Sequence, residues 1–150
     1  MSNTGRRLTS LLGNSQKLDG GAMFGIVPKI LWEDKFIADS KNRIQLSCNC
    51  LLIKTPDTLA LIDTGFGTRL NKKSREQFGV TPVNTLADSL SEYGAKPGDV
   101  DIVVLTHLHF DHVGGNSLLK KKYGAKVIGF EGDKHRIPEI DLGLKDKEKF

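Results

Sequence analysis

Four side chains of metal-ligating type lie within six positions of this sequence, at His107, His109, Asp111 and His112. They follow the apolar, β-branched run 101–106, which predicts a buried strand. Because side chains two positions apart in an extended chain point the same way, His107 and His109 can hold one ion together. Asp111 and His112 are adjacent where the chain turns, so they can address a second ion beside the first. Neutral imidazole and carboxylate suit zinc, and also manganese, iron or cobalt.

The clustering of the histidines favours a metal site over a set of satisfied core residues. A single histidine is more often a hydrogen-bonded structural residue, but three of the four in the chain fall in this cluster. Gly114 and Gly115 follow directly, and their missing side chains permit close approach of the backbone. The fourth histidine, His135, lies in a charged stretch, so we expect it on the surface, together with Asp133 and Asp141.

Two strands are expected before the histidine cluster, and they help to position its side chains. Residues 44–53 alternate between polar and apolar side chains, and residues 59–62 form a second apolar run that ends at Asp63. The turn residues between them predict an antiparallel hairpin. Taken by itself, Asp63 is most simply a turn residue at the end of a strand.

Cys48 and Cys50 lie two positions apart in the first of these strands. Their side chains should share one face, roughly 7 Å apart, which is too far for an unstrained disulfide. An isolated Cys-x-Cys pair is a weak metal motif. We therefore expect both residues to act as small buried hydrophobes.

The rest of the chain alternates between helical and strand patterns. Helices are expected at 81–93 and 117–123, a helical turn at Pro97 and a further strand at 126–130. The layout is a mixed α/β (α+β) fold with a sheet covered by helices. Residues 20–28, apolar and rich in glycine, suggest a short strand or a loop near the site. We expect residues 1–18 to be a flexible N-terminal arm and residues 19–150 to form the domain.

Composition narrows the function classes. The 150 residues carry a net charge of +4, with the excess in basic clusters at 69–75 and 120–122. Aromatic side chains do not interleave with these clusters, so we expect solvated faces and no nucleic-acid partner. No apolar run reaches the ~20 residues of a membrane helix, and no signal peptide is visible. The expectation is a cytoplasmic protein without membrane contact.

The motif His-x-His-x-Asp-His at 107–112, with Gly114 and Gly115 behind it, resembles the signature of the metallo-β-lactamase superfamily. Residues 63–65, Asp-Thr-Gly, match a second landmark of that superfamily. The resemblance implies an αββα sandwich that holds two divalent metal ions, zinc first, with manganese, iron or cobalt as alternatives. It also implies that Asp63 lies beside the metals and contacts their ligands.

A finer resemblance divides the chain in two. Residues 19–115 resemble the quorum-quenching branch, the N-acyl-homoserine lactone lactonases, through the run Gly-Gly-Ala-Met-Phe-Gly at 20–25. Residues 116–150 are more similar to glyoxalase II, a thioesterase of the same superfamily. The first implies a hydrolase that opens a small-molecule lactone or ester by attack of a metal-bridging hydroxide, with Asp111 as ligand and proton acceptor. The second implies a glyoxalase II-like thioester hydrolase.

The superfamily pattern requires three further ligands, a histidine, a bridging aspartate and a second histidine, from later in the chain. His135 comes too early to match the first of them. We therefore expect only the N-terminal half of the sandwich. A third interpretation follows, in which the chain is a catalytically incomplete half-domain. Such a half-domain would bind metal only, or pair as a homodimer or with a complementing C-terminal half.

Overall fold

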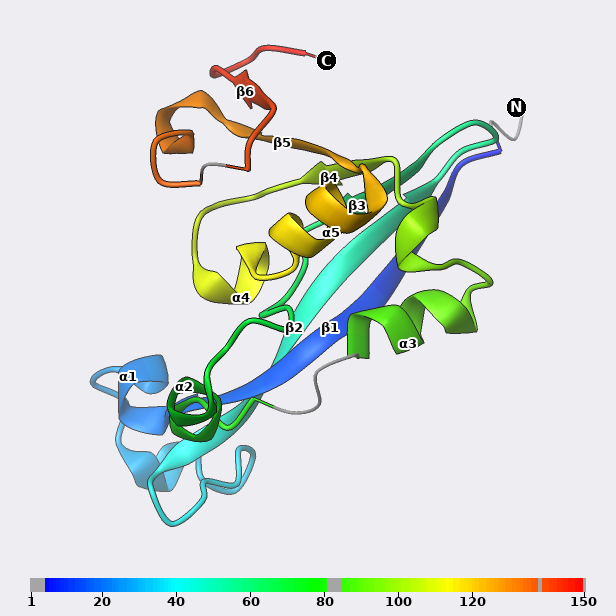
Figure 1. Cartoon of the computed structure of the whole chain (residues 1–150). Helices are drawn as coiled ribbons and strands as arrows, with labels where there is room; N and C mark the ends of the chain where they lie inside the picture. Colours follow the sequence, from blue (N-terminus) through cyan, green and yellow to red (C-terminus); the bar gives the residue numbers. More distant parts are fainter. Residues whose placement is uncertain (1–4, 81–84, 138, 150) are drawn as a thin grey trace.

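The computed structural model describes residues 5–80, 85–137 and 139–149. Its strands form one six-stranded sheet in the order β1-β2-β3-β4-β5-β6 (Figure 1). Their bounds are Arg7–Asp19, Arg43–Lys54, Leu59–Ile62, Ile102–Val104, Lys126–Phe130 and Leu142–Leu144. The pairs β1–β2 and β2–β3 are antiparallel, whereas β3 through β6 run parallel. This mixed sheet confirms the predicted α/β class.

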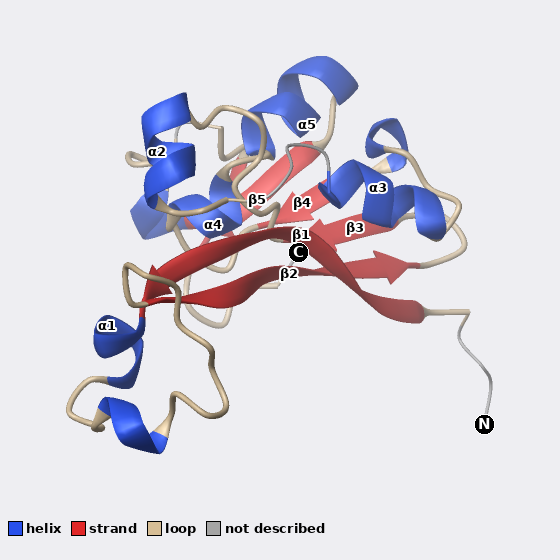
Figure 2. Ribbon diagram, turned by 90° about the horizontal axis from the view of Figure 1, so that it is seen from below, coloured by secondary structure: helices blue, strands red, loops and turns tan. Residues whose placement is uncertain are grey.

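Helices cover one face of this sheet. The α-helices α1 to α5 span Gly20–Phe24, Lys72–Gln77, Thr85–Glu92, Phe110–Val113 and Asn116–Tyr123. The 3-10 turns η1 to η3 span Lys29–Leu31, Pro97–Asp99 and Glu131–Asp133. Figure 2 shows α2 to α5 on the same side of the sheet, with α1 at the end of the β1–β2 hairpin. One sheet with one helical layer is half of an αββα sandwich, as expected. None of the described helices is both long and apolar enough to cross a bilayer.

The core lies between the central strands and two of these helices. Leu61, Val103 and Val127 come from three neighbouring strands and are fully buried. They pack with Leu90 of α3 and Leu119 of α5 in one apolar cluster. Each such side chain contributes about 1.5–3 kcal/mol of burial free energy, so the cluster fixes the strands that end at the site.

The prediction of a flexible arm over 1–18 is wrong from Arg7 onward. Residues 7–19 form β1, which pairs with β2 along its whole length. The sequence pattern hides this strand because a bulge at Gly13 breaks the period of two and because two of its inward residues, Asn14 and Gln16, are polar. The domain therefore includes β1 instead of beginning at residue 19; residues 1–4 lie outside the described residues.

Most of the other predicted strands and helices are present in the structure. The hairpin of β2 and β3, the strand β4, helix α5 and strand β5 are all confirmed, although within β4 only Val103 is fully buried. The described part of the helix expected at 81–93 is α3, and residues 81–84 lie outside the described residues. Residues 20–28 hold the short helix α1 and a loop, so of the two alternatives the strand is wrong. Strand β6, with three residues, was too short to predict.

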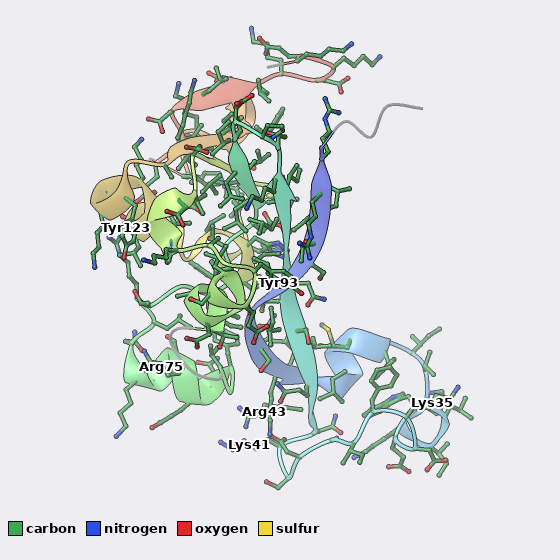
Figure 3. All side chains as sticks on the ribbon, turned by 90° about the vertical axis from the view of Figure 1, so that its right-hand side faces the viewer. Lys35, Lys41, Arg43, Arg75, Tyr93 and Tyr123 are labelled. Carbon is green, nitrogen blue, oxygen red and sulfur yellow. The ribbon has the colours of Figure 1, made fainter. Side chains whose placement is uncertain are left out.

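The far end of the β1–β2 hairpin is tied to helix α2 by Arg43 (Figure 3). The guanidinium donates through Nη1 to the backbone oxygens of Gln77 at 2.7 Å and Glu76 at 3.0 Å. The guanidinium also pairs with Asp39 at 2.9 Å. The hydrogen bonds that Arg43 donates to Asp39 hold the pKa of the Asp39 carboxyl well below its usual range. The hairpin is thereby fixed at the end remote from the core.

Candidate metal centre

The four predicted ligands lie where the parallel strands β3 and β4 end. Asp63 follows β3, and Thr106 with the histidine motif follows β4. Since the carboxyl ends of parallel strands meet at one edge of a sheet, the two loops lie side by side. Backbone bonds join them: Thr64 N–H donates to the carbonyl of His112 at 2.7 Å, and Gly114 N–H donates to that of Gly65 at 2.9 Å.

The carboxylate of Asp63 is buried and organises the second loop. Its Oδ1 accepts from Thr106 N–H at 2.9 Å, and its Oδ2 accepts from the Thr106 hydroxyl at 2.7 Å. The same Oδ2 lies 2.8 Å from Nδ1 of His112. A carboxylate can only accept, so in a neutral His112 imidazole Nδ1 carries the proton and Nε2 keeps its lone pair. Asp63 is thus more than the turn residue that it resembles in isolation.

The hydroxyl of Thr106 fixes a second imidazole. Its one proton goes to Asp63, so Oγ1 accepts from Nδ1 of His107, which lies 3.0 Å away. Nε2 of His107 is therefore also the unprotonated nitrogen. Thr106 was not predicted as a site residue, although it directly precedes the motif.

The predicted ligand atoms lie in two pairs. Nε2 of His107 lies 3.1 Å from Nδ1 of His109, and Nε2 of His112 lies 3.6 Å from Oδ2 of Asp111. Two ligands at tetrahedral positions around one zinc ion would stand about 3.3 Å apart, so each pair fits one ion. The rings of His107 and His112 have centroids 4.0 Å apart, which makes the two pairs neighbours.

Each pair offers two of the predicted ligands. Within residues 5–80, 85–137 and 139–149, no group of three or more histidine, cysteine or acidic side chains is arranged to hold an ion. The fourth histidine, His135, lies after η3 and is exposed, as predicted. Asp141, expected as an ordinary surface acid, is exposed yet accepts from Val127 N–H at 2.9 Å and Lys120 Nζ at 2.6 Å.

Two glycines behind the motif are required by the close packing of the loops. A Cβ on Gly115 would stand 2.9 Å from Cβ of Thr64. A Cβ on Gly114 would collide with the backbone of Phe66. The expected close approach of the backbone is confirmed at both positions.

Both cysteines are buried and carry free thiols, as predicted. Burial, with a smaller contribution from the negative charge of Asp111, raises the pKa of Cys48 to about 12. Burial, followed by the negative charges of Asp63 and Cys48, raises the pKa of Cys50 to about 12. Because the thiolate is the metal-binding form, these values fit the role of small hydrophobes better than that of ligands.

Sequence reasoning missed a further contact of Asp111. Nε2 of Gln16, in β1, donates to Oδ2 of Asp111 at 2.9 Å across 95 positions of sequence. Gln16 fell in the segment expected to be an arm, and no local pattern marks it as a site residue.

Comparison with protein families places this geometry in context. A model of the metallo-beta-lactamase superfamily matches residues 43–149. A hydroxyacylglutathione hydrolase from Pelagibacter ubique is 61% identical over 46 residues, which are 31% of this chain and 19% of that protein.

Two solved structures share the fold. One is described as a probable metal-dependent hydrolase from Staphylococcus aureus; it is 33% identical, with a TM-score of 0.76 over 91% of this chain and 50% of its own. Another is AidC, described as a dizinc quorum-quenching lactonase, which is 18% identical, with a TM-score of 0.67 over 100% of this chain and 62% of its own. The chain thus spans 50% of the first structure and 62% of the second.

Proposed function

Because the chain belongs to the metallo-β-lactamase superfamily, we propose that it carries part of the binuclear metal centre of a hydrolase. The observation that carries this proposal is the pair of donor sets, 3.1 Å and 3.6 Å between ligand atoms, set side by side. His107 and His109 would hold one ion, and Asp111 and His112 the other. The imidazole and carboxylate set favours zinc, with manganese, iron or cobalt as alternatives.

The residues of this chain prepare the site for hydrolysis of an ester-type carbonyl. Divalent ions bound there would activate water and polarise the carbonyl. Asp63 and Thr106 hold His107 and His112 with their Nε2 lone pairs available, so these two imidazoles need no tautomer change before an ion binds. Oδ2 of Asp111 is engaged by Gln16, and we assign Oδ1 to accept and pass on a proton.

The leading substrate class is a small-molecule lactone or related ester. Residues 19–115 support it through their resemblance to acyl-homoserine lactone hydrolases. A hollow of about 310 Å³ beside α4 supports it too, because the apolar Phe66, Leu70, Phe110 and Val113 line it beside the polar Arg69, Ser117 and Glu139. Such a surface suits an acyl chain.

A thioester substrate is a second candidate, with equal support from sequence. The 61% identity to a hydroxyacylglutathione hydrolase favours it, although the match covers 19% of that enzyme. The chemistry at the carbonyl is the same, and the leaving group is a thiolate instead of an alkoxide. A third candidate is a half-domain that binds metal alone, or pairs with a second copy or a complementing chain.

One experiment separates the three candidates. The purified protein, loaded with zinc and with metal content measured, is assayed on an N-acyl-homoserine lactone and on S-lactoylglutathione. We expect turnover of the lactone, loss of turnover in His109→Ala, and retention in the matched control His135→Ala, which removes an exposed imidazole outside the motif. Turnover of the thioester alone selects the second candidate. Inactivity with fewer than two bound ions selects the third, and full activity of His109→Ala refutes the proposed centre.

A further inference from the structure

Gln16 is a buried amide whose position the sequence gives no reason to expect. Gln16 is 5% exposed, and its Nε2 donates to Oδ2 of Asp111 at 2.9 Å. Asp111 in turn faces Nε2 of His112 with that same oxygen, at 3.6 Å. One hydrogen bond therefore connects the first strand of the sheet to the second pair of ligand atoms.

A β-bulge turns this side chain inward. The register of β1 against β2 shifts between Leu12 and Asn14, so that Gly13 is the extra residue. Before the bulge Leu11 faces the core, and after it the even-numbered Asn14 and Gln16 do. Without the extra residue the two amides would point to the opposite face, since side chains alternate along a strand.

The bulge itself is built for close contact. A Cβ on Gly13 would stand 2.9 Å from both the carbonyl oxygen of Cys48 and Sγ of Cys50. The inward Asn14 accepts from the backbone N–H of Phe66 at 2.9 Å and so holds the loop after β3. The bulge thus aims two neighbouring amides at the two loops that make the site.

A neutral donor is well suited to this position. Burying an amide is unfavourable unless it is paired, and a bond to a carboxylate is stronger than one to a neutral acceptor. Arginine or lysine would also bind Asp111, but as cations they would compete with a metal ion for its charge. Glutamine orients the carboxylate and leaves the charge available.

We infer that Gln16 is a positioning residue for the metal centre, fixing the carboxylate of Asp111 against His112 so that the pair can hold its ion. This inference rests on the proposed binuclear centre. A purely structural role, in which the bond only satisfies a buried amide, would leave ion binding at the second pair unchanged when the bond is removed.

The test is the stepwise binding of cobalt(II), followed by calorimetry and by visible absorption of the bound ion. We expect Gln16→Met to weaken one of the two binding steps about 10–100-fold and to alter its spectrum, while the other step stays as in the wild type. The matched control is Gln45→Met, which changes an exposed glutamine on the neighbouring strand β2 and should leave both steps unchanged.

A measurement on the wild type keeps the inference testable should Gln16→Met fold poorly. In a zinc titration followed by NMR, the side-chain amide of Gln16 should shift with one of the two equivalents. Equal affinities in Gln16→Met and wild type, or an amide signal that does not move while both ions bind, would overturn the role of Gln16 alone. A wild type that binds fewer than two ions would instead overturn the proposed centre.

Discussion

Two aspartates of this chain make similar bonds and serve different ends. Asp63 accepts from a backbone N–H and a hydroxyl of Thr106 and contacts His112 at 2.8 Å. Asp141 accepts from a backbone N–H of β5, at Val127, and from Lys120 at 2.6 Å. Each therefore accepts from one backbone N–H and contacts at least one side chain of another segment.

The difference lies in where each network ends. Lys120 is a fixed cation that balances the charge of Asp141, and it holds the pKa of that carboxyl below its ordinary value, with Val127 N–H adding to the effect. The bonds of Asp63 lead instead to imidazoles whose second nitrogens face other ligand atoms. A polar network that closes on itself is structural, whereas one that leaves lone pairs aimed together prepares a binding site.

The largest effect is expected where the open network is cut at its centre, in Asp63→Asn. Asparagine tolerates the positive φ of 60° at this position, so the turn should survive. The asparagine side chain has one oxygen that accepts and one NH₂ group that only donates, so it cannot accept all three bonds. Metal affinity should therefore fall about 100-fold. The free energy of unfolding should fall by about 1–3 kcal/mol.

Metal titration and urea unfolding measure these two effects. Asp57→Asn, an exposed position in the β2–β3 turn, is the matched control and should change neither quantity. Wild-type metal affinity in Asp63→Asn would show that the carboxylate does not orient His112.

A smaller effect is expected for Thr106→Val, which removes only the hydroxyl. Nδ1 of His107 loses its acceptor, while the contact between Asp63 and His112 remains. Metal affinity should fall about 10-fold. In nitrogen NMR of the metal-free protein, the tautomer of His107 should become mixed and that of His112 should persist. Thr9→Val, on β1, is the control, and an unchanged His107 tautomer would refute the role given to Thr106.

The smallest effect is expected for Asp141→Asn, which breaks the closed network. Metal binding should be unchanged, and the free energy of unfolding should fall by about 1 kcal/mol or less, as for a solvent-exposed ion pair. Because folding lowers the pKa of Asp141, its stabilisation is present above the ordinary carboxyl value of 3.8 and is lost as the pH falls through the folded value.

Thermal unfolding of Asp141→Asn and wild type between pH 7 and pH 3 measures this. The difference in Tm should be largest at neutral pH and should narrow below about pH 4. A difference that grows on acidification would contradict the assigned direction, and a change in metal affinity would show that the two networks are coupled.

Sequence alone determined the elements whose information is local. Residue type and periodicity over a few positions encode the motif at 107–112, the strand before it, the hairpin of β2 and β3 and the helix α5. Both can be read without knowing which residues are neighbours in space. The prediction of His107, His109, Asp111 and His112 as metal ligands rests on the same local information, because side-chain chemistry belongs to the residue.

Only the tertiary structure decided how the predicted ligands are held. Gln16 and Asp111 are 95 positions apart, and Asp63 and His112 are 49 apart. No periodic pattern links such positions, and the bulge at Gly13 erased the alternation that would have revealed β1. The bond between Asp63 and His112 arises because the parallel strands β3 and β4 bring their carboxyl ends to one edge of the sheet. The bond between Gln16 and Asp111 arises because the bulge in β1 turns Gln16 inward.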